Sequence, residues 1–219
     1  MNKFDASLTL SNMVQEYSND FLLSSTAYLK KLNNSFTETV LVGVKSLSDG
    51  LHKAWSSNSQ VFICGNGGSA ANALHMANDF HYGIGACGPG PQLPGLRVEA
   101  LPANIGILTC LANDTGYENI YSHQLKVKAN PGDLLIVLSG SGNSANIVNA
   151  LSTARELGMR SYAIVAFSGG RCKELADQAI HFPINDMQIA EDTQLIIGHL
   201  CMQWLNTHKP QHLQPKSNG

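Results

Sequence analysis

The sequence predicts an α/β fold of three layers, in which helices cover both faces of a central parallel sheet of about five strands. Apolar runs alternate with helix-like segments from residue 60 onward, which is the pattern of repeated strand–helix units. Two of these runs end in glycine and serine, within residues 61–79 (VFICGNGGSAANALHMAND) and 135–146 (LIVLSGSGNSAN). Because strands buried on both faces are apolar throughout, we expect both runs to lie inside the sheet.

The composition is that of one globular domain. The 219 residues are enough to bury a substantial core. A net charge of −2 favours neither nucleic acid nor an acidic membrane surface as a partner. The first residues lack the continuous apolar core of a signal peptide, and no run approaches the length of a membrane-spanning helix. We therefore expect no nucleic-acid partner and no membrane partner.

The five cysteines indicate a reducing compartment. Their number is odd, no two form a CxxC pair, and most lie in apolar runs, where a free cysteine behaves as a small hydrophobe. We therefore predict free thiols and a cytoplasmic protein. The cysteines are Cys64, Cys87, Cys110, Cys172 and Cys201.

Residues from about 7 to 57 are predicted to form two helices. Asn33 and Asn34 interrupt the apolar pattern, and either Ser35 or Thr37 is placed to cap the second helix. These helices are long for a domain of this size, so we expect part of their face to contact another subunit; the alternative is packing on their own domain alone. The apolar stripe comprises Leu8, Leu10, Met13, Val14, Tyr17, Phe21, Leu22, Tyr28 and Leu29, then Val40, Val42, Val44, Leu47, Leu51 and Trp55.

The remaining elements follow from apolar runs and turn residues. Strands are expected at residues 61–64, 96–100, 134–138, 161–165 and 178–182, and helices at 69–80, 105–112, 117–125, 145–157, 170–176 and 188–205. Residues 81–94 are rich in glycine and proline and are predicted to form a loop. The chain then divides into N-terminal helices for oligomerisation (1–58), the α/β domain (59–207) and a flexible polar tail (208–219).

Two glycine- and serine-rich turns follow predicted strands, at residues 65–69 and 139–144. Open parallel sheets bind ligands at the carboxyl ends of their strands, and small residues let the backbone approach an anion at the next helix N-terminus. Neither turn is a nucleotide-binding signature, and each alone would be typical of a helix cap. Together they favour one phosphate-bearing ligand, held by Asn66, Gly67, Gly68, Ser69, Ser139, Gly140, Ser141 and Ser144.

A second group of residues is ionisable. His75 and Asp79 are four residues apart on one predicted helix, and Glu191 and His199 are eight apart on another, so each pair shares a helix face. Two imidazoles and two carboxylates could hold a divalent ion such as Zn²⁺. Without metal, the same groups are suited to move a proton between two carbons beside a carbonyl. The alternative is a set of surface side chains with His199 in the core.

Four segments resemble the sugar isomerase (SIS) domain family and, within it, the phosphoheptose isomerases. They are CGNGGSAANALHMANDF, CLANDTGYENIYSHQ, PGDLLIVLSGSGNSANIVNAL and AEDTQLIIGHL, and the resemblance extends from about residue 28 to residue 205. It implies the SIS fold for residues 59–207 and a homotetramer whose sites lie between subunits. The implied reaction interconverts sedoheptulose 7-phosphate and glycero-manno-heptose 7-phosphate.

The resemblance also implies roles for individual residues. Phosphate would be bound by the serines of the two turns, with Asn66 and Asp114 nearer to the sugar. The family's zinc and catalytic positions correspond to His75, Asp79, Glu191 and His199, and Glu191 is also expected to bind the substrate.

The chain departs from the family pattern at several of these positions. Asp79 stands where the family has a catalytic glutamate, and Glu191 stands where it has a glutamine. Gly140 replaces the threonine of STSGNS, and Ser168 stands where the family often has aspartate in DGG. The segment after Asp79 reads FHYGIGACGPGP, where the isomerases carry TGR with an arginine that contacts the sugar.

These patterns favour an aldose–ketose isomerase of a sugar phosphate. A base would take the C2 proton of the aldose and return it to C1 through an enediol, with His199 as one acid/base partner and either Asp79 or Glu191 as the other. The altered carboxylate pair also fits a non-catalytic scaffold or regulator of the same fold that binds a protein partner. A sugar-phosphate sensor is a third alternative, but no helix-turn-helix segment or basic patch accompanies the domain.

Overall fold

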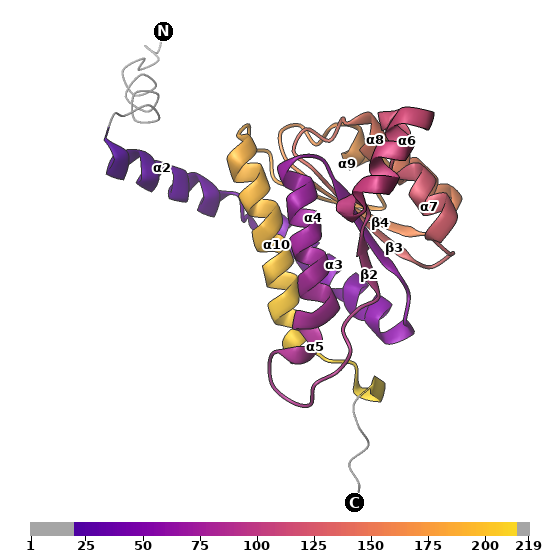
Figure 1. Cartoon of the computed structure of the whole chain (residues 1–219). Helices are drawn as coiled ribbons and strands as arrows, with labels where there is room; N and C mark the ends of the chain where they lie inside the picture. Colours follow the sequence, from indigo (N-terminus) through magenta and orange to yellow (C-terminus); the bar gives the residue numbers. More distant parts are fainter. Residues whose placement is uncertain (1–19, 214–219) are drawn as a thin grey trace, which may run out of the picture.

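A computed structural model describes residues 20–213. They form three layers, a central parallel sheet with helices on each of its two faces (Figure 1). The strand order is β2-β1-β3-β4-β5, and every neighbouring pair is parallel. The sheet therefore confirms the predicted fold class. The strands are β1 (Val61–Gly65), β2 (Val98–Ala100), β3 (Leu134–Ser139), β4 (Arg160–Val165) and β5 (Gln178–His181).

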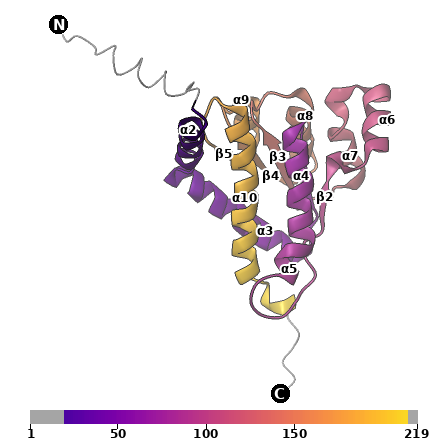
Figure 2. The ribbon, with the colours of Figure 1, turned by 60° about the vertical axis from the view of Figure 1, so that its left-hand side comes forward.

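Helices connect the strands and cover both faces of the sheet (Figures 1 and 2). Each β-to-β connection crosses one face, as parallel strands require. The longer helices are α2 (Phe21–Asn34), α3 (Glu38–Ser57), α4 (Gly68–Asn78), α6 (Ile105–Thr115), α7 (Ser122–Lys128), α8 (Ala145–Glu156) and α10 (Met187–Thr207). Shorter elements are the π turn Asp79–Gly83, α5 (Ile84–Ala86), α9 (Gly170–Leu175) and 3₁₀ turns at Leu101–Ala103, Tyr117–Asn119 and Gln211–Leu213.

Alternate residues of each strand feed two separate cores. Ile63 and Ile136 belong to the core beneath α3, α4 and α10, whereas Phe62 and Leu135 belong to the core beneath α7, α8 and α9. All four side chains are almost completely buried. Because successive side chains of a strand point to opposite faces, two-sided burial explains the unbroken apolar runs in the sequence.

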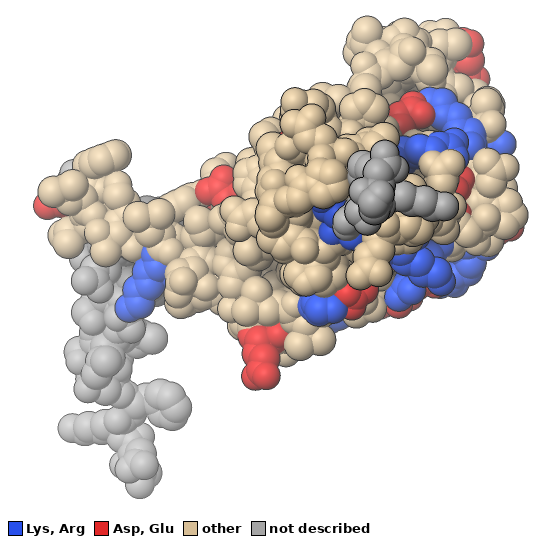
Figure 3. All heavy atoms as spheres, turned by 90° about the horizontal axis from the view of Figure 1, so that it is seen from below, with Lys and Arg blue, Asp and Glu red and all other residues tan. Residues whose placement is uncertain are grey.

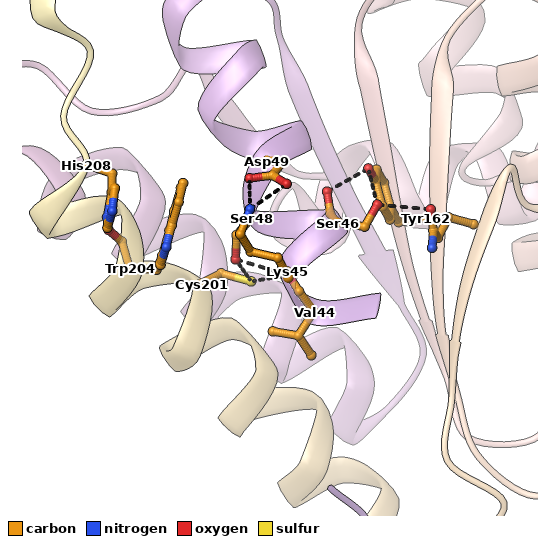
Figure 4. Close-up of polar contacts among 10 residues, drawn as sticks. Val44, Lys45, Ser46, Ser48, Asp49, Tyr162, Cys201, Trp204 and His208 are labelled. Carbon is orange, nitrogen blue, oxygen red and sulfur yellow. Dashed lines mark hydrogen bonds and ion pairs between the residues drawn. The ribbon is translucent and has the colours of Figure 1, made fainter. Parts of the chain in front are cut away.

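The helix α3 is tied to the sheet on one side and to α10 on the other (Figure 4). The Tyr162 hydroxyl on β4 donates to the Ser46 carbonyl at 2.9 Å, and the Ser48 hydroxyl donates to the Cys201 sulfur on α10 at 3.3 Å. Burial raises the pKa of the Cys201 thiol to about 12. This thiol therefore stays protonated near neutral pH and acts as a packed, hydrogen-bonded group.

The N-terminal helices behave differently from one another. Thr37, not Ser35, caps α3 by accepting from the Val40 backbone N–H, and α2 ends at Asn34 as predicted. Every residue of α2 is exposed or half-buried, and Phe21 exposes 80% of its surface. In Figure 1, α2 extends away from the body of the domain. The apolar positions predicted from Leu8 to Tyr17 lie outside the described residues.

The prediction of a loop at residues 81–94 is wrong for residues 81–86. The helix that begins at Gly68 continues through the π turn and α5 as far as Ala86. Phe80 and Ile84 are fully buried, and added Cβ atoms at Gly83 and Gly85 would meet Met202 and the Leu93 backbone. The glycines therefore permit close packing of a helix rather than a loop.

The first part of the predicted tail lies against the domain. Lys209 is only 8% exposed, and its ammonium group donates to the Gly85 and Pro91 carbonyls at 3.0 Å each.

On the face seen from below, Lys and Arg side chains lie among acidic ones (Figure 3). Among the described residues, no helix is both long enough and apolar enough to cross a bilayer.

Candidate active site

The first glycine-rich turn joins β1 to α4. Gly67 has a φ of 56°, in the left-handed region that favours glycine. A Cβ at Gly65 would lie 2.7 Å from the Ser69 backbone, so the strand end and the helix start approach closely. Ser69 is buried and its hydroxyl donates to the Gln194 side chain at 2.9 Å. No side chain caps α4 among the described residues, which leaves its first N–H groups directed toward the turn.

The second turn joins β3 to α8. Gly142 has a φ of 68°, and its N–H donates to the Ser139 hydroxyl at 3.1 Å. A Cβ at Gly142 would overlap the Gly169 carbonyl, so only glycine fits there. Ser144 is the residue before α8, and its side chain makes no capping bond within the described chain. Its hydroxyl is therefore available to a ligand.

The two turns line one cavity of about 280 Å³ at the carboxyl ends of β1 and β3. Asn66 and Asn146 connect the turns by donating to each other at 2.9 and 2.8 Å, and the Tyr117 hydroxyl donates to Asn66 at 3.0 Å. The structure thus brings together all eight residues of the two turns predicted to hold a phosphate-bearing ligand. The cavity is lined by Asn66, Gly67, Gly68, Ser69, Leu138, Ser139, Gly140, Ser141, Ser144, Met187 and Glu191.

Two side chains from the first turns of α10 enter this cavity. Met187 lies over Gly140, where an added Cβ would be 2.7 Å from the Met187 sulfur. Glu191 lies over Gly68, where an added Cβ would overlap the carboxylate itself. Because residues four apart share a helix face, one face of α10 covers both turns.

A cluster of ionisable side chains lies further along the same helices. The Nε2 atoms of His75 and His199 are 2.9 Å apart, and Asp79 Oδ2 lies 3.4 Å from the first and 3.5 Å from the second. All three ligand atoms lie within 4.8 Å of one another. Helix α4 and the start of the π turn supply His75 and Asp79, and α10 supplies His199.

The geometry of this cluster fits a divalent ion such as zinc. Tetrahedral zinc with bonds near 2.1 Å places its ligand atoms about 3.4 Å apart, which matches both Asp79–histidine separations. The two histidine nitrogens are 2.9 Å apart, so they would move apart by about 0.5 Å to bind the ion. Two imidazoles and one carboxylate, with a fourth position open, is the ligand set of catalytic zinc sites. The arrangement is equally suited to proton transfer, because a carboxylate contacts two imidazoles.

Glu191 does not join the cluster. It precedes His199 by eight residues on α10, which corresponds to about 12 Å along the helix axis. Its carboxylate lies instead in the cavity between the two turns, over Gly68. The shared helix face was predicted from the spacing, but the four side chains predicted to converge are divided between two positions.

Asp114 lies outside both parts of the site. It is on α6, where it accepts from the Cys110 thiol at 3.5 Å and from the Asn113 amide at 2.7 Å, and it does not line the cavity. The hydrogen bond to Asp114 raises the pKa of the Cys110 thiol. These local contacts are of the kind that aspartate makes near a helix end.

Gln194 and Met187 belong to the site but were not predicted from the sequence. Gln194 is fully buried, its side-chain oxygen accepts from Ser69, and its Nε2 has no hydrogen-bond partner within the described chain. The signal was an amide at an apolar position of TQLIIGHL, three residues after Glu191 and hence on its face. For Met187, the one sequence feature that indicated a place in the site is its position one helical turn before Glu191.

The chain matches known proteins along most of its length. The SIS domain family model matches residues 26–166. The phosphoheptose isomerase of Akkermansia muciniphila is 38% identical over 146 residues, which are 66% of this chain and 74% of that protein. The phosphoheptose isomerase of Chlorobium phaeobacteroides is 33% identical over 184 residues, which are 84% of this chain and 80% of that protein.

A solved structure agrees with the fold. That of phosphoheptose isomerase GmhA from Neisseria gonorrhoeae has a TM-score of 0.76 and 23% identity, and the match covers 85% of this chain and 99% of that one. The family model and the relatives bear out the resemblance found in the motifs. The chain belongs to the SIS domain family.

Proposed function

We propose that this protein interconverts sedoheptulose 7-phosphate and D-glycero-manno-heptose 7-phosphate by enediol proton transfer. The chain is an isomerase related to phosphoheptose isomerases, and the substrate is our inference from those names and from the site. One observation carries the proposal most directly. A hydroxyl-lined cavity and a histidine–carboxylate cluster lie between the same two helices, α4 and α10, about two turns of α10 apart.

This arrangement suits an acyclic sugar phosphate. Serine hydroxyls and the N-termini of α4 and α8 provide hydrogen-bond donors for a phosphate group. The cluster at His199 is about two helical turns away from Glu191 at the cavity. An extended sugar phosphate of six or seven carbons spans a comparable distance, so its C1–C2 end reaches the cluster while the phosphate stays in the cavity.

The reaction needs one group that takes a proton from carbon and one that moves a proton between oxygens. We assign Asp79 as the base, because its carboxylate is 13% exposed and is in contact with two imidazoles. His199 then acts as the acid that moves a proton between O1 and O2. Should His75, Asp79 and His199 instead hold zinc, the ion would polarise the substrate carbonyl.

We also propose a homotetramer in the cytoplasm. Phe21, Leu22 and Leu29 on α2 each expose more than half of their surface, which a second subunit would cover. All five cysteines carry free thiols, as expected in a reducing compartment. Light scattering coupled to size-exclusion chromatography tests the assembly: a monomer at micromolar concentration would contradict it.

The activity is tested with the purified full-length chain and sedoheptulose 7-phosphate in D₂O, with and without zinc. We expect formation of the aldose and incorporation of deuterium at carbon, which is the signature of an enediol. His199→Ala should abolish both, whereas His212→Ala, an exposed histidine outside the site, should leave both unchanged. Absence of turnover on every heptose and hexose phosphate tested would favour the scaffold alternative.

A further inference from the structure

We propose that Glu191 is an internal competitor for the phosphate-binding cavity, displaced by the substrate and thereby setting the affinity of the site for phosphate. This inference rests on the proposed function, because it takes the cavity between the two turns as the phosphate site. It concerns how the anion enters a cavity in which this chain already places a carboxylate.

The carboxylate of Glu191 occupies the space that an anion would need. Both of its oxygens lie so close to Gly68 that a Cβ at this glycine would overlap them. Gly68 is the first residue of α4, whose N-terminus carries no side-chain cap within the described chain. A carboxylate is stabilised at such a helix start for the same reason that a phosphate is.

The Glu191 carboxylate should oppose phosphate binding, because no positively charged side chain lines the cavity within the described chain. No lysine or arginine is among the described residues that line the cavity, and Glu191 is its one acidic member. A phosphate dianion would therefore enter a site whose only formal charge has the same sign. Like charges at close range repel strongly in a partly desolvated site, so the carboxylate and the phosphate cannot both remain over Gly68.

The displacement is a side-chain rotation rather than a movement of α10. The backbone carbonyl of Glu191 accepts from the Asn72 amide at 2.8 Å, and Asp186 caps the helix by accepting from the Ile189 N–H. These contacts hold the first turns of α10 against α4. The Glu191 side chain is half-buried, which leaves it a path toward solvent when an anion arrives.

Binding of inorganic phosphate tests the proposal without reliance on turnover. We would measure the Kd by isothermal titration calorimetry at pH 8 in a sulfate-free buffer, for the full-length protein and for Glu191→Gln. The substitution keeps the shape of the side chain and removes its charge. We expect phosphate to bind Glu191→Gln about tenfold more tightly than the unmodified protein. Glu174→Gln, an exposed residue on α9, removes the same charge elsewhere and should leave the Kd unchanged.

A second substitution locates the effect. Adding Ser141→Ala to Glu191→Gln should remove most of the gain, because this hydroxyl lines the cavity. Thermal unfolding of each variant verifies that it is folded.

Each outcome decides between the two proposals. Tighter binding by Glu191→Gln alone supports the competitor role. Equal binding by the unmodified protein and Glu191→Gln, with weaker binding once Ser141→Ala is added, overturns that role while leaving the cavity as an anion site. Equal binding by every variant, the one with Ser141→Ala included, overturns that role and places the anion outside the cavity. Weaker binding by Glu191→Gln than by the unmodified protein shows that Glu191 helps to hold the anion, which also overturns the competitor role. No phosphate binding by any variant contradicts both this inference and the assignment of the cavity to phosphate.

Discussion

Replacing Asp79 by asparagine should remove zinc-dependent stabilisation of this protein. Asp79→Asn keeps the volume of the side chain but eliminates the one carboxylate in the His75–Asp79–His199 cluster. Its Oδ2 lies 3.4 and 3.5 Å from the two imidazole nitrogens. A neutral amide oxygen is a much weaker zinc ligand than a carboxylate, so the site would keep two good ligands of three.

The expected magnitude follows from mass action. At a free zinc concentration 100 times the Kd, binding stabilises the native state by about 2.7 kcal/mol. For a domain of this size each kcal/mol shifts the Tm by about 2–4 °C, so the unmodified protein should gain about 5–11 °C. Loss of a direct ligand should weaken zinc binding by about 100-fold or more, since loss of an outer partner alone costs 10–100-fold. The variant would then gain about 0.4 kcal/mol, or about 1 °C, at the same zinc concentration.

Thermal unfolding of metal-stripped protein in a zinc-buffered series measures this difference. Asp49→Asn is the matched control, because Asp49 is an exposed carboxylate that pairs with Lys45 on α3 (Figure 4). The control should show the full zinc-dependent gain. Equal gains in Asp79→Asn and the unmodified protein, or no gain in the unmodified protein, would refute the assignment of the cluster as a zinc site.

Two further predictions concern the packing around α10. Lys209→Met should lower the free energy of unfolding by about 2 kcal/mol, because two backbone carbonyls lose a charged donor; urea denaturation measures it, and an unchanged midpoint would contradict the role of this contact. Cys201, whose pKa is raised to about 12, should resist iodoacetamide at pH 8 in the native protein while exposed Cys87 is modified. Peptide mass spectrometry distinguishes the two thiols, and comparable labelling of both would contradict the burial of Cys201.

The sheet could be predicted from the sequence because its strands are buried on both faces. In β3 every residue from Leu134 to Leu138 is apolar and buried, so the strand is visible as an unbroken run. The predicted bounds of this strand differ from the observed ones by one residue. The edge strand β2 is only three residues long and less buried, and its start was placed two residues too early.

The helix end near residue 86 could not be predicted from local composition. The segment HYGIGACGPGP carries the glycines and prolines of a loop, yet Gly83 and Gly85 lie in helical turns. Their lack of a side chain permits contact of Gly83 with Met202, which is distant in sequence, and of Gly85 with the Leu93 carbonyl, eight residues further along the chain. Tertiary packing of this kind overrides a propensity that is judged from neighbours alone.

Part of the site could be predicted from the sequence, because it depends on the order of strands and turns. The carboxyl ends of parallel strands meet at one edge of the sheet, so the two serine-rich turns could be expected to converge. Helical periodicity placed Glu191 and His199 on one face, but the same eight-residue spacing also puts them about 12 Å apart along the axis, too far apart to join one cluster. The packing of Glu191 over Gly68 depends on contact between α10 and α4, which a single sequence does not reveal.

The π turn after Asp79 bears on how this chain tolerates changes in length. The Ile84 N–H donates to the Asp79 carbonyl, five residues earlier, so this turn holds one residue more than its neighbours in the same helix. A single-residue deletion between positions 80 and 83 would convert it to an ordinary turn, whereas a deletion between His75 and Asp79 would rotate one of these side chains relative to the other. Evolutionary gain or loss of one residue is therefore best accommodated in this wide turn, immediately beside the cluster.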